Sequence, residues 1–237
     1  MQLLRSLLFS TGMIVSTLIF AILCVLLAPA PYFFRYRFTT LWNRFNLWWL
    51  KFTCRIDFEI NGLENIPPGP AIIFCKHQST WETIALPTIF PPQVWVLKRE
   101  LLWVPFFGWG LALLKPIAIN RKAGRKAINQ ILHQGLARLH AGLWVVFFPE
   151  GTRVAPGKQV RYKMGGALLA EHTRYPVVPV AHNAGEFWGR RQFVKTPGTI
   201  RISIGPAIDT TDLSANEINT RAQQWIEDTL SQYNRQA

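Results

Sequence analysis

Cysteines are few in this chain, and several common functional motifs are missing. Cys24, Cys54 and Cys75 are an odd number and lie in stretches of different character, so they do not form the disulfide framework of a small secreted domain. No Cys/His spacing indicates a metal site. No Gly-x-Ser-x-Gly motif is present, which argues against a serine hydrolase of the α/β class. The sequence also contains no internal repeat and no low-complexity segment.

Acidic side chains are scarce as well. The chain has 13 Asp and Glu against 26 Lys and Arg, which gives a net charge of +13. Strongly basic proteins bind nucleic acids or anionic membrane surfaces. Because the sequence lacks a zinc-finger spacing and an aromatic-basic RNA motif, we expect no nucleic-acid partner. Several of its ten Trp residues cluster near the apolar N-terminus, where interfacial anchors stand, so we expect an anionic membrane surface as a partner.

Charge is absent from Leu7–Ala28, a stretch of about the twenty residues that cross a hydrocarbon core. A signal peptide is the rival interpretation, but the apolar run exceeds a usual signal-peptide core, so we predict an uncleaved anchor. The basic residues that follow, from Arg35 onward, place the rest of the chain on the cytoplasmic side of the inner membrane.

Residues 35–55 interleave basic and aromatic side chains, with Trp42, Phe45, Trp49 and Phe52 at helical spacing. This pattern predicts an amphipathic helix in the headgroup layer, and a helix packed on the globular domain is the alternative. We therefore divide the chain into a membrane segment, residues 1–55, and a globular domain, residues 56–237. The sequence leaves open whether the first helix spans the membrane or both helices lie in one leaflet.

Apolar runs alternate with helical patterns along the globular domain. This alternation predicts an α/β fold with a mostly parallel or mixed sheet and helices on both faces. The predicted strands are Ala71–Cys75, Val94–Leu97, Leu143–Phe148, Val177–Val180, an edge strand Asp57–Asn61 and a last strand combining Ile200–Ile204 with Ile208. Leu143–Phe148 is almost continuously apolar, which is typical of a central parallel strand.

The most informative stretch follows the strand Ala71–Cys75. Ser79 and Glu82 match a capping box, which predicts a helix beginning at Ser79 and places His77 at the strand-to-helix corner. In one interpretation Glu82 only caps the helix and His77 is a surface histidine. In the other, His77 is a general base that Glu82 orients. Five residues apart on a straight helix the two would diverge, so the pair requires His77 to fold back over the first turn.

A second group of polar residues follows Leu143–Phe148, at the end of a parallel strand where α/β proteins bind ligands. Gly151 allows close backbone approach, Thr152 offers a hydroxyl and Arg153 offers positive charge. Arg121, after Ile117–Asn120, is a candidate phosphate ligand because its planar guanidinium can donate two hydrogen bonds at once. Glu150 either orients arginines, holds substrate hydroxyls or accepts from backbone amides.

His77-x4-Glu82 followed by Phe148-Pro-Glu-Gly-Thr-Arg153 resembles the glycerolipid acyltransferases, and within them most of all the lysophosphatidic acid acyltransferases. The resemblance implies that residues 56–237 are an acyltransferase domain. It implies acyl transfer from acyl-CoA or acyl carrier protein, with no further cofactor, to the sn-2 hydroxyl of 1-acyl-glycerol 3-phosphate, giving phosphatidic acid. His77 and Glu82 would be catalytic. The implied substrate-binding residues are Arg121, Glu150, Gly151, Thr152 and Arg153.

Two departures from the family pattern keep alternatives open. Glu82 stands where the family most often has Asp, and Lys115-Pro116 replaces residues that are usually glycine and apolar. A different lysolipid acceptor, such as a lyso-amino-acid lipid or a lysophospholipid, is therefore the second hypothesis. A membrane-surface binding protein without activity is the third.

Overall fold

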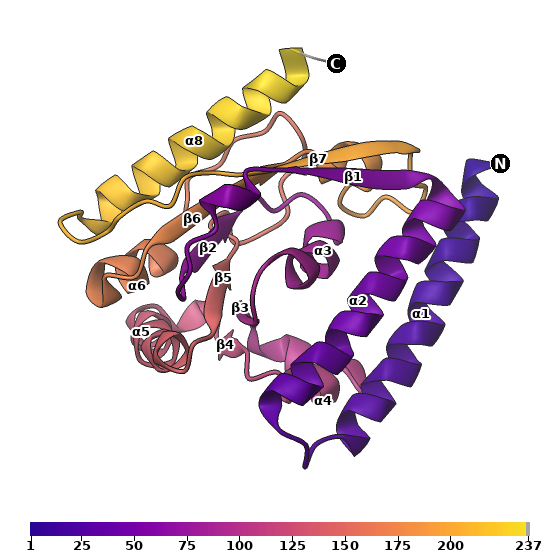
Figure 1. The fold of residues 1–237 in the computed structure, drawn as a ribbon, viewed down its shortest axis with the longest axis horizontal. Coiled ribbons are helices and arrows are strands. Elements are labelled where there is room, and N and C mark those ends of the chain that lie inside the picture. The colour runs from indigo at the N-terminus through magenta and orange to yellow at the C-terminus, as the bar shows by residue number, and fades with distance from the viewer. Residues whose placement is uncertain (236–237) are drawn as a thin grey trace.

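A seven-stranded mixed sheet runs through the centre of the molecule in the order β1-β7-β6-β2-β5-β3-β4 (Figure 1). We describe residues 1–235 of a computed structural model. The strands are β1 (Ile56–Asn61), β2 (Ile72–Cys75), β3 (Gln93–Lys98), β4 (Ile117–Ile119), β5 (Trp144–Phe147), β6 (Val177–His182) and β7 (Gly198–Ile204). All neighbouring strands are parallel except β6 and β7, which are antiparallel. The prediction of a mostly parallel or mixed sheet is confirmed.

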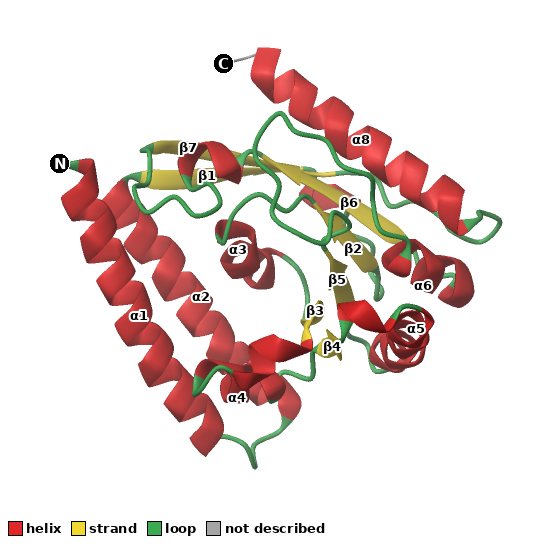
Figure 2. Cartoon of the chain, turned by 180° about the vertical axis from the view of Figure 1, so that it is seen from behind, coloured by secondary structure: helices red, strands yellow, loops and turns green. Residues whose placement is uncertain are grey.

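Helices cover both faces of this sheet (Figures 1 and 2). They are α1 (Gln2–Leu26), α2 (Tyr32–Cys54), α3 (Trp81–Ile89), α4 (Phe107–Ala112), α5 (Arg125–His140), α6 (Gly165–Thr173), α7 (Ala184–Phe187) and α8 (Ala215–Arg235), with short 3-10 helices η1 (Leu63–Asn65), η2 (Arg99–Trp103) and η3 (Arg121–Ala123). One core cluster joins α1, α2 and α3 to one sheet face, and the other joins α5, α6 and α8 to the opposite face.

Strand β2 shows how the sequence divides between these two cores. Successive side chains of a strand point to opposite faces. Ile73 and Cys75 belong to the cluster with α3, whereas Ile72 and Phe74 belong to the cluster with α5, α6 and α8. All four residues of β2 are buried because the strand lies in the middle of the sheet between β5 and β6. The residues that follow Cys75 therefore leave the sheet at its centre.

Helices α1 and α2 lie side by side along one flank (Figure 1). Among residues 1–235, α1 is the one helix long and apolar enough to cross a membrane, and Leu3, Ile14 and Leu26 are among its exposed side chains. Phe9 of α1 and Leu50 of α2 nevertheless belong to the same core cluster as the sheet. The core thus extends across the boundary that we drew at residue 55, and the division at that residue stays a prediction.

Two details of the sequence prediction are wrong. Helix α3 begins at Trp81, two residues later than expected, although the capping box itself forms: the Ser79 amide donates to Glu82, and the Ser79 hydroxyl accepts from the Trp81 amide. Ile208 does not extend β7, which ends at Ile204. It forms an isolated antiparallel bridge with Val177 of β6, after Gly205 and Pro206 interrupt the strand.

Candidate active site

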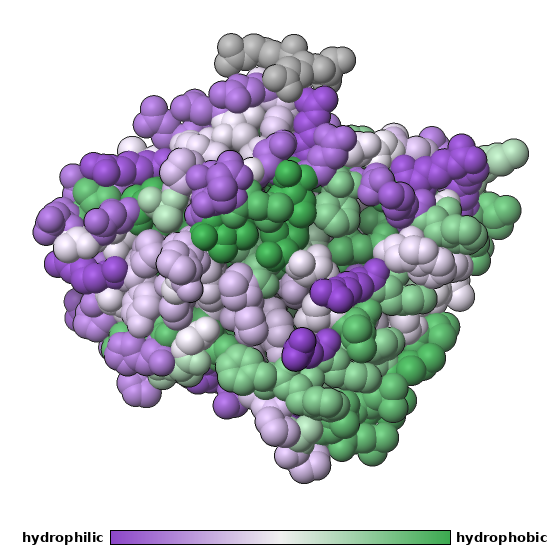
Figure 3. Space-filling model, in the orientation of Figure 1, coloured by the Kyte–Doolittle hydropathy of each residue, from purple (hydrophilic) through white to green (hydrophobic). Residues whose placement is uncertain are grey.

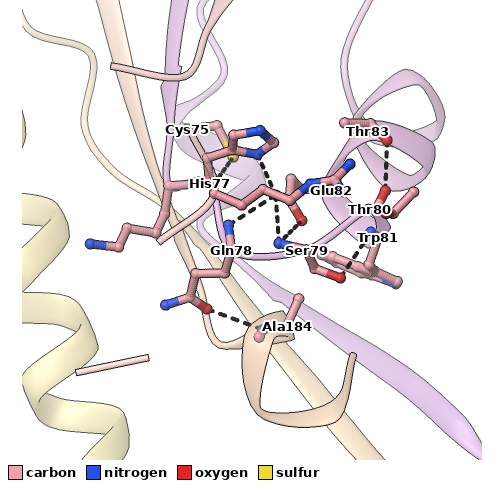
Figure 4. Close-up of polar contacts among 12 residues, drawn as sticks. Cys75, His77, Gln78, Ser79, Thr80, Trp81, Glu82, Thr83 and Ala184 are labelled. Carbon is pink, nitrogen blue, oxygen red and sulfur yellow. Dashed lines mark hydrogen bonds and ion pairs between the residues drawn. The ribbon is translucent and has the colours of Figure 1, made fainter. Parts of the chain in front are cut away.

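His77 and Glu82 form a hydrogen-bonded pair at the corner between β2 and α3 (Figure 4). The His77 Nδ1 atom lies 2.7 Å from Glu82 Oε1. Glu82 is fully buried, whereas 15% of the His77 side chain is exposed. His77 lies outside the helix and folds back over its first turn, which is the geometry that the catalytic interpretation requires.

The Glu82 carboxylate is held in place from several directions. It accepts hydrogen bonds from the backbone amides of Gln78, at 3.0 Å, and Ser79, at 2.9 Å. Burial raises the pKa of Glu82, but the nearby His182 and His77 and the Ser79 amide outweigh burial and lower the pKa below its ordinary value. Glu82 is therefore an ionised acceptor. Since Glu82 accepts a hydrogen bond from Nδ1–H of His77, Nε2 remains the basic atom of the imidazole.

Aromatic packing fixes the plane of the His77 ring. The Phe148 ring stacks on it with a centroid separation of 3.9 Å and an interplanar angle of 14°. Trp95 of β3 also stacks on Phe148, with 5.7 Å between the two ring centroids and an interplanar angle of 18°. Phe148 directly follows β5, the neighbour of β2, so the parallel pairing of these strands brings the two rings together.

The loop after β5 closes against the backbone of His77. The Val154 amide donates to the His77 carbonyl oxygen at 2.8 Å, and the His77 amide donates to Glu150 Oε1 at 3.4 Å. Gly151 has φ +69°, a left-handed conformation that favours glycine. The two sequence motifs, more than seventy residues apart, thus share one set of hydrogen bonds.

Cationic side chains gather beside Gly151. The Arg121 guanidinium donates to the Gly151 carbonyl oxygen. The Lys163 side chain lies next to Gly151, since a side chain added at Gly151 would be in ordinary van der Waals contact with it. Arg153 is half-buried and Thr152 is exposed. Positive groups around an exposed loop next to the His77–Glu82 pair are suited to hold an anionic group of a substrate.

Glu150 lies beneath the site instead of at its surface. Its side chain is fully buried, with Oε1 3.6 Å from Lys76 Nζ. Burial raises the pKa of Glu150 to about 7, although the Lys76 cation opposes that rise. Of the three roles that the sequence left open, contact with backbone amides is the one that these distances support.

Comparison with known proteins identifies the family. Residues 57–183 match the family model described as Acyltransferase. The chain is 44% identical over 236 residues to the 1-acyl-sn-glycerol-3-phosphate acyltransferase of Pseudomonas aeruginosa, an alignment that covers 98% of this chain and 92% of that protein. The chain belongs to the acyltransferase family.

Other acyltransferases match over shorter or more divergent alignments. The 1-acyl-sn-glycerol-3-phosphate acyltransferase of Saccharomyces cerevisiae is 32% identical over 74% of this chain and 59% of its own length. The crystal structure of the 1-acyl-sn-glycerophosphate acyltransferase of Thermotoga maritima superposes with a TM-score of 0.82, covering 98% of this chain and 96% of that one at 20% identity. This likeness extends to the N-terminal helices and shows that the fold is that of an acyltransferase.

Sequence reasoning missed several polar residues of this acyltransferase site. His182, at the end of β6, is fully buried, and its Nε2 donates to the Lys76 carbonyl oxygen at 2.8 Å and lies 3.8 Å from Glu82 Oε2. Its Nδ1 accepts from the Ala184 amide at 3.2 Å, and burial lowers the pKa of His182 below its ordinary value. The sequence signal for His182 is that a polar residue ends the otherwise apolar strand β6.

Among residues 1–235, no group of three or more His, Cys, Asp or Glu side chains is arranged to hold a metal ion.

Proposed function

We propose that this acyltransferase moves an acyl chain from a thioester, carried by coenzyme A or acyl carrier protein, to the sn-2 hydroxyl of 1-acyl-glycerol 3-phosphate. The product is phosphatidic acid. The pairing of His77 with a buried, ionised Glu82 beside the cationic Gly151 loop is the observation that carries the proposal. The 44% identity to the Pseudomonas aeruginosa 1-acyl-sn-glycerol-3-phosphate acyltransferase supports this acceptor.

The site residues divide the chemistry between proton transfer and substrate binding. His77 Nε2 takes the proton of the acceptor hydroxyl as its oxygen attacks the thioester carbonyl carbon. The C–S bond then breaks, and the departing thiolate takes that proton back from His77, so no covalent enzyme intermediate forms. Glu82 stabilises the imidazolium that exists between the two steps. Arg121 and Arg153, with the Gly151 backbone, bind the phosphate, and Thr152 offers a hydroxyl to the same substrate.

A turnover assay tests this function. Purified protein in detergent is given lysophosphatidic acid and either acyl-CoA or acyl carrier protein, and thioester consumption is followed beside His77→Ala. We expect turnover with the wild type and a loss of at least about 100-fold in the variant. If only a lyso-amino-acid lipid or a lysophospholipid is acylated, the acceptor is wrong while the base assignment stands. If no thioester is consumed with any acceptor, the enzyme assignment fails.

The contacts of α1 with the rest of the protein bear on how the enzyme sits at the membrane. Near the N-terminal end of α1, the Ser6 hydroxyl accepts from the Lys195 amide at 2.9 Å, and near its C-terminal end Cys24 Sγ lies 3.8 Å from the Gly110 carbonyl oxygen. Because α1 rests on the catalytic domain at both ends, crossing a bilayer would require it to leave that surface. These contacts support helices that lie in one leaflet, and the basic residues from Arg35 onward support the cytoplasmic side of the inner membrane. The net charge of +13 supports an anionic surface as partner.

A further inference from the structure

Lys76, the residue before the histidine base, is almost completely buried, with 1% of its surface exposed. It continues the alternation of β2, so its side chain points to the face occupied by Ile72 and Phe74, opposite His77. An apolar residue at position 76 would fill the same buried space without the free-energy cost of removing a charged group from water. A lysine here therefore calls for a reason other than core packing.

The reason lies on the C-terminal helix. The Lys76 Nζ atom donates to Glu227 Oε1 of α8 at 2.6 Å and lies 3.6 Å from Glu150 Oε1. Only 14% of the Glu227 side chain is exposed, so water screens this ion pair weakly. Helix α8 packs over this face of the sheet (Figures 1 and 2), and Glu227 lies outside residues 57–183, the part that matches the family model.

The backbone of Lys76 is held as firmly as its side chain. Its amide donates to the Val180 carbonyl oxygen at 3.0 Å, and its carbonyl oxygen accepts from His182 Nε2 at 2.8 Å. Glu150 Oε1 in turn lies near both Lys76 Nζ and the His77 amide. A displacement of the Lys76 side chain would therefore act on His77 through Glu150, which contacts both the Lys76 ammonium group and the His77 amide.

We propose that Lys76 and Glu227 are positioning residues for acyl transfer, and that α8 supports the His77 loop through their ion pair. The proposal rests on the proposed function. Neither side chain touches the substrate in this role. Their ion pair fixes the position of the end of β2, from which His77 projects, relative to α8. The positively charged ammonium group of Lys76 keeps Glu150 near the His77 amide. Rate should depend on this pair, because displacements of about 1 Å reduce catalysis by about 100-fold.

The decisive variant replaces both charges, Lys76→Met with Glu227→Leu. Replacing both partners of a buried ion pair with apolar groups commonly preserves stability, and Glu150, which loses its nearest cation in this variant, can take up a proton because burial already raises its pKa to about 7. We expect kcat to fall about 10- to 100-fold, while KM for lysophosphatidic acid changes less than about twofold and the melting temperature stays within a few degrees. Asp228→Asn is the matched control, because Asp228 is the exposed neighbour of Glu227 on α8, and its kcat should equal that of the wild type.

A folded double variant with kcat within about twofold of the wild type overturns the proposal. So does a rise in KM at unchanged kcat, which would indicate substrate binding instead of positioning. If the double variant does not fold, Glu227→Gln decides, since it keeps the size of the side chain but removes the negative charge that holds the Lys76 ammonium group. A lower kcat with unchanged KM in that variant supports the proposal, and wild-type kcat overturns it. All rates are compared with wild type on whichever acceptor the wild type uses, so failure of the proposed acceptor remains a separate result.

Discussion

The length of the side chain at position 82 determines how the His77 loop is held. The Glu82 carboxylate reaches His77 Nδ1 and the amides of Gln78 and Ser79 at the same time. An aspartate would end about 1.5 Å short of these groups. Because the loop here is built around the longer residue, the family's more frequent aspartate is not an equivalent replacement in this chain.

We predict that Glu82→Asp lowers kcat by about 10- to 100-fold although it conserves the charge, because the shorter carboxylate cannot satisfy His77 and both amides together. Glu82→Gln should lower kcat further, since it also removes the charge that stabilises imidazolium. Steady-state kinetics in detergent measures both, with melting temperatures to establish that the variants are folded. Full activity of Glu82→Asp would show that the backbone shifts to meet a shorter side chain.

Glu150 should make stability depend on pH. Its pKa is about 7 in the folded protein, and a glutamate titrates near 4.3 in an unfolded chain. Between these values the folded state holds more protons, so this residue's contribution to stability falls as pH rises through the window.

The Glu150→Gln side chain does not ionise. We predict that the wild type loses stability relative to Glu150→Gln between pH 5 and pH 8, on the order of 3 kcal/mol. Thermal melts of both proteins across this range measure it, and parallel curves would contradict it.

Sequence separation explains which site residues could be predicted. His77 and Glu82 are five residues apart, so helix geometry alone tests their pairing. Lys76 and Glu227 are 151 residues apart, and Lys76 and His182 are 106 apart. Nothing local marks such partners. They meet because β2 and β6 are neighbours in the sheet and α8 packs over that face.

At the scale of elements, the start of a helix could be predicted where the capping residues bond only to each other. The sequence Ser214-x-x-Glu217 is a second capping box, and the Ser214 amide donates to Glu217 Oε2 at 2.9 Å just before α8. The capping box at Ser79 forms as well, since the Ser79 amide donates to Glu82 and the Ser79 hydroxyl accepts from the Trp81 amide. There the helix begins only at Trp81, and Glu82 also accepts from the Gln78 amide and pairs with His77, contacts that the local motif does not predict.

Helix α1 is part of the catalytic domain's core as well as an apolar surface. Phe9 has no exposed surface, and its ring meets Trp188 edge-on at a centroid distance of 5.2 Å. The sequence could not show this, since one face of an all-apolar helix looks much like another. We predict that Phe9→Ala destabilises the protein by about 3–5 kcal/mol, the usual cost of deleting a buried aromatic ring.

The adjacent residue provides the control. Leu8 is 49% exposed, so Leu8→Ala should leave the melting temperature in detergent nearly unchanged, whereas Phe9→Ala should lower it by several degrees. Equal, small effects of the two substitutions would contradict the packing of α1 and favour a detachable anchor. Such an outcome would also support the division of the chain at residue 55.

At the scale of the whole molecule, exposed apolar side chains lie on the flank of α1 and α2. Figure 3 shows an apolar surface at the lower right, where Figure 1 places α1, α2 and α4. Helix α4 and the preceding η2 add large exposed side chains, among them Trp103 and Trp109. Cys24 Sγ of α1 lies 3.8 Å from the Gly110 carbonyl oxygen of α4, so the two regions are continuous. An apolar patch of this kind on a basic protein is suited to a lipid leaflet.

We predict that Trp103→Ser combined with Trp109→Ser weakens binding to anionic phospholipid vesicles by at least about tenfold, because each indole contributes buried apolar area at the interface. Activity on short-chain, soluble substrates should be unchanged, since neither residue contacts His77 or Glu82.

Val160→Ser is the control. Val160 is also an exposed apolar residue, but its carbonyl oxygen accepts from Gln223 of α8, on the opposite face of the sheet. Vesicle co-sedimentation measures the binding at two salt concentrations. If the double variant and the control bind equally well, α4 does not enter the leaflet, and α1 and α2 alone hold the enzyme at the membrane.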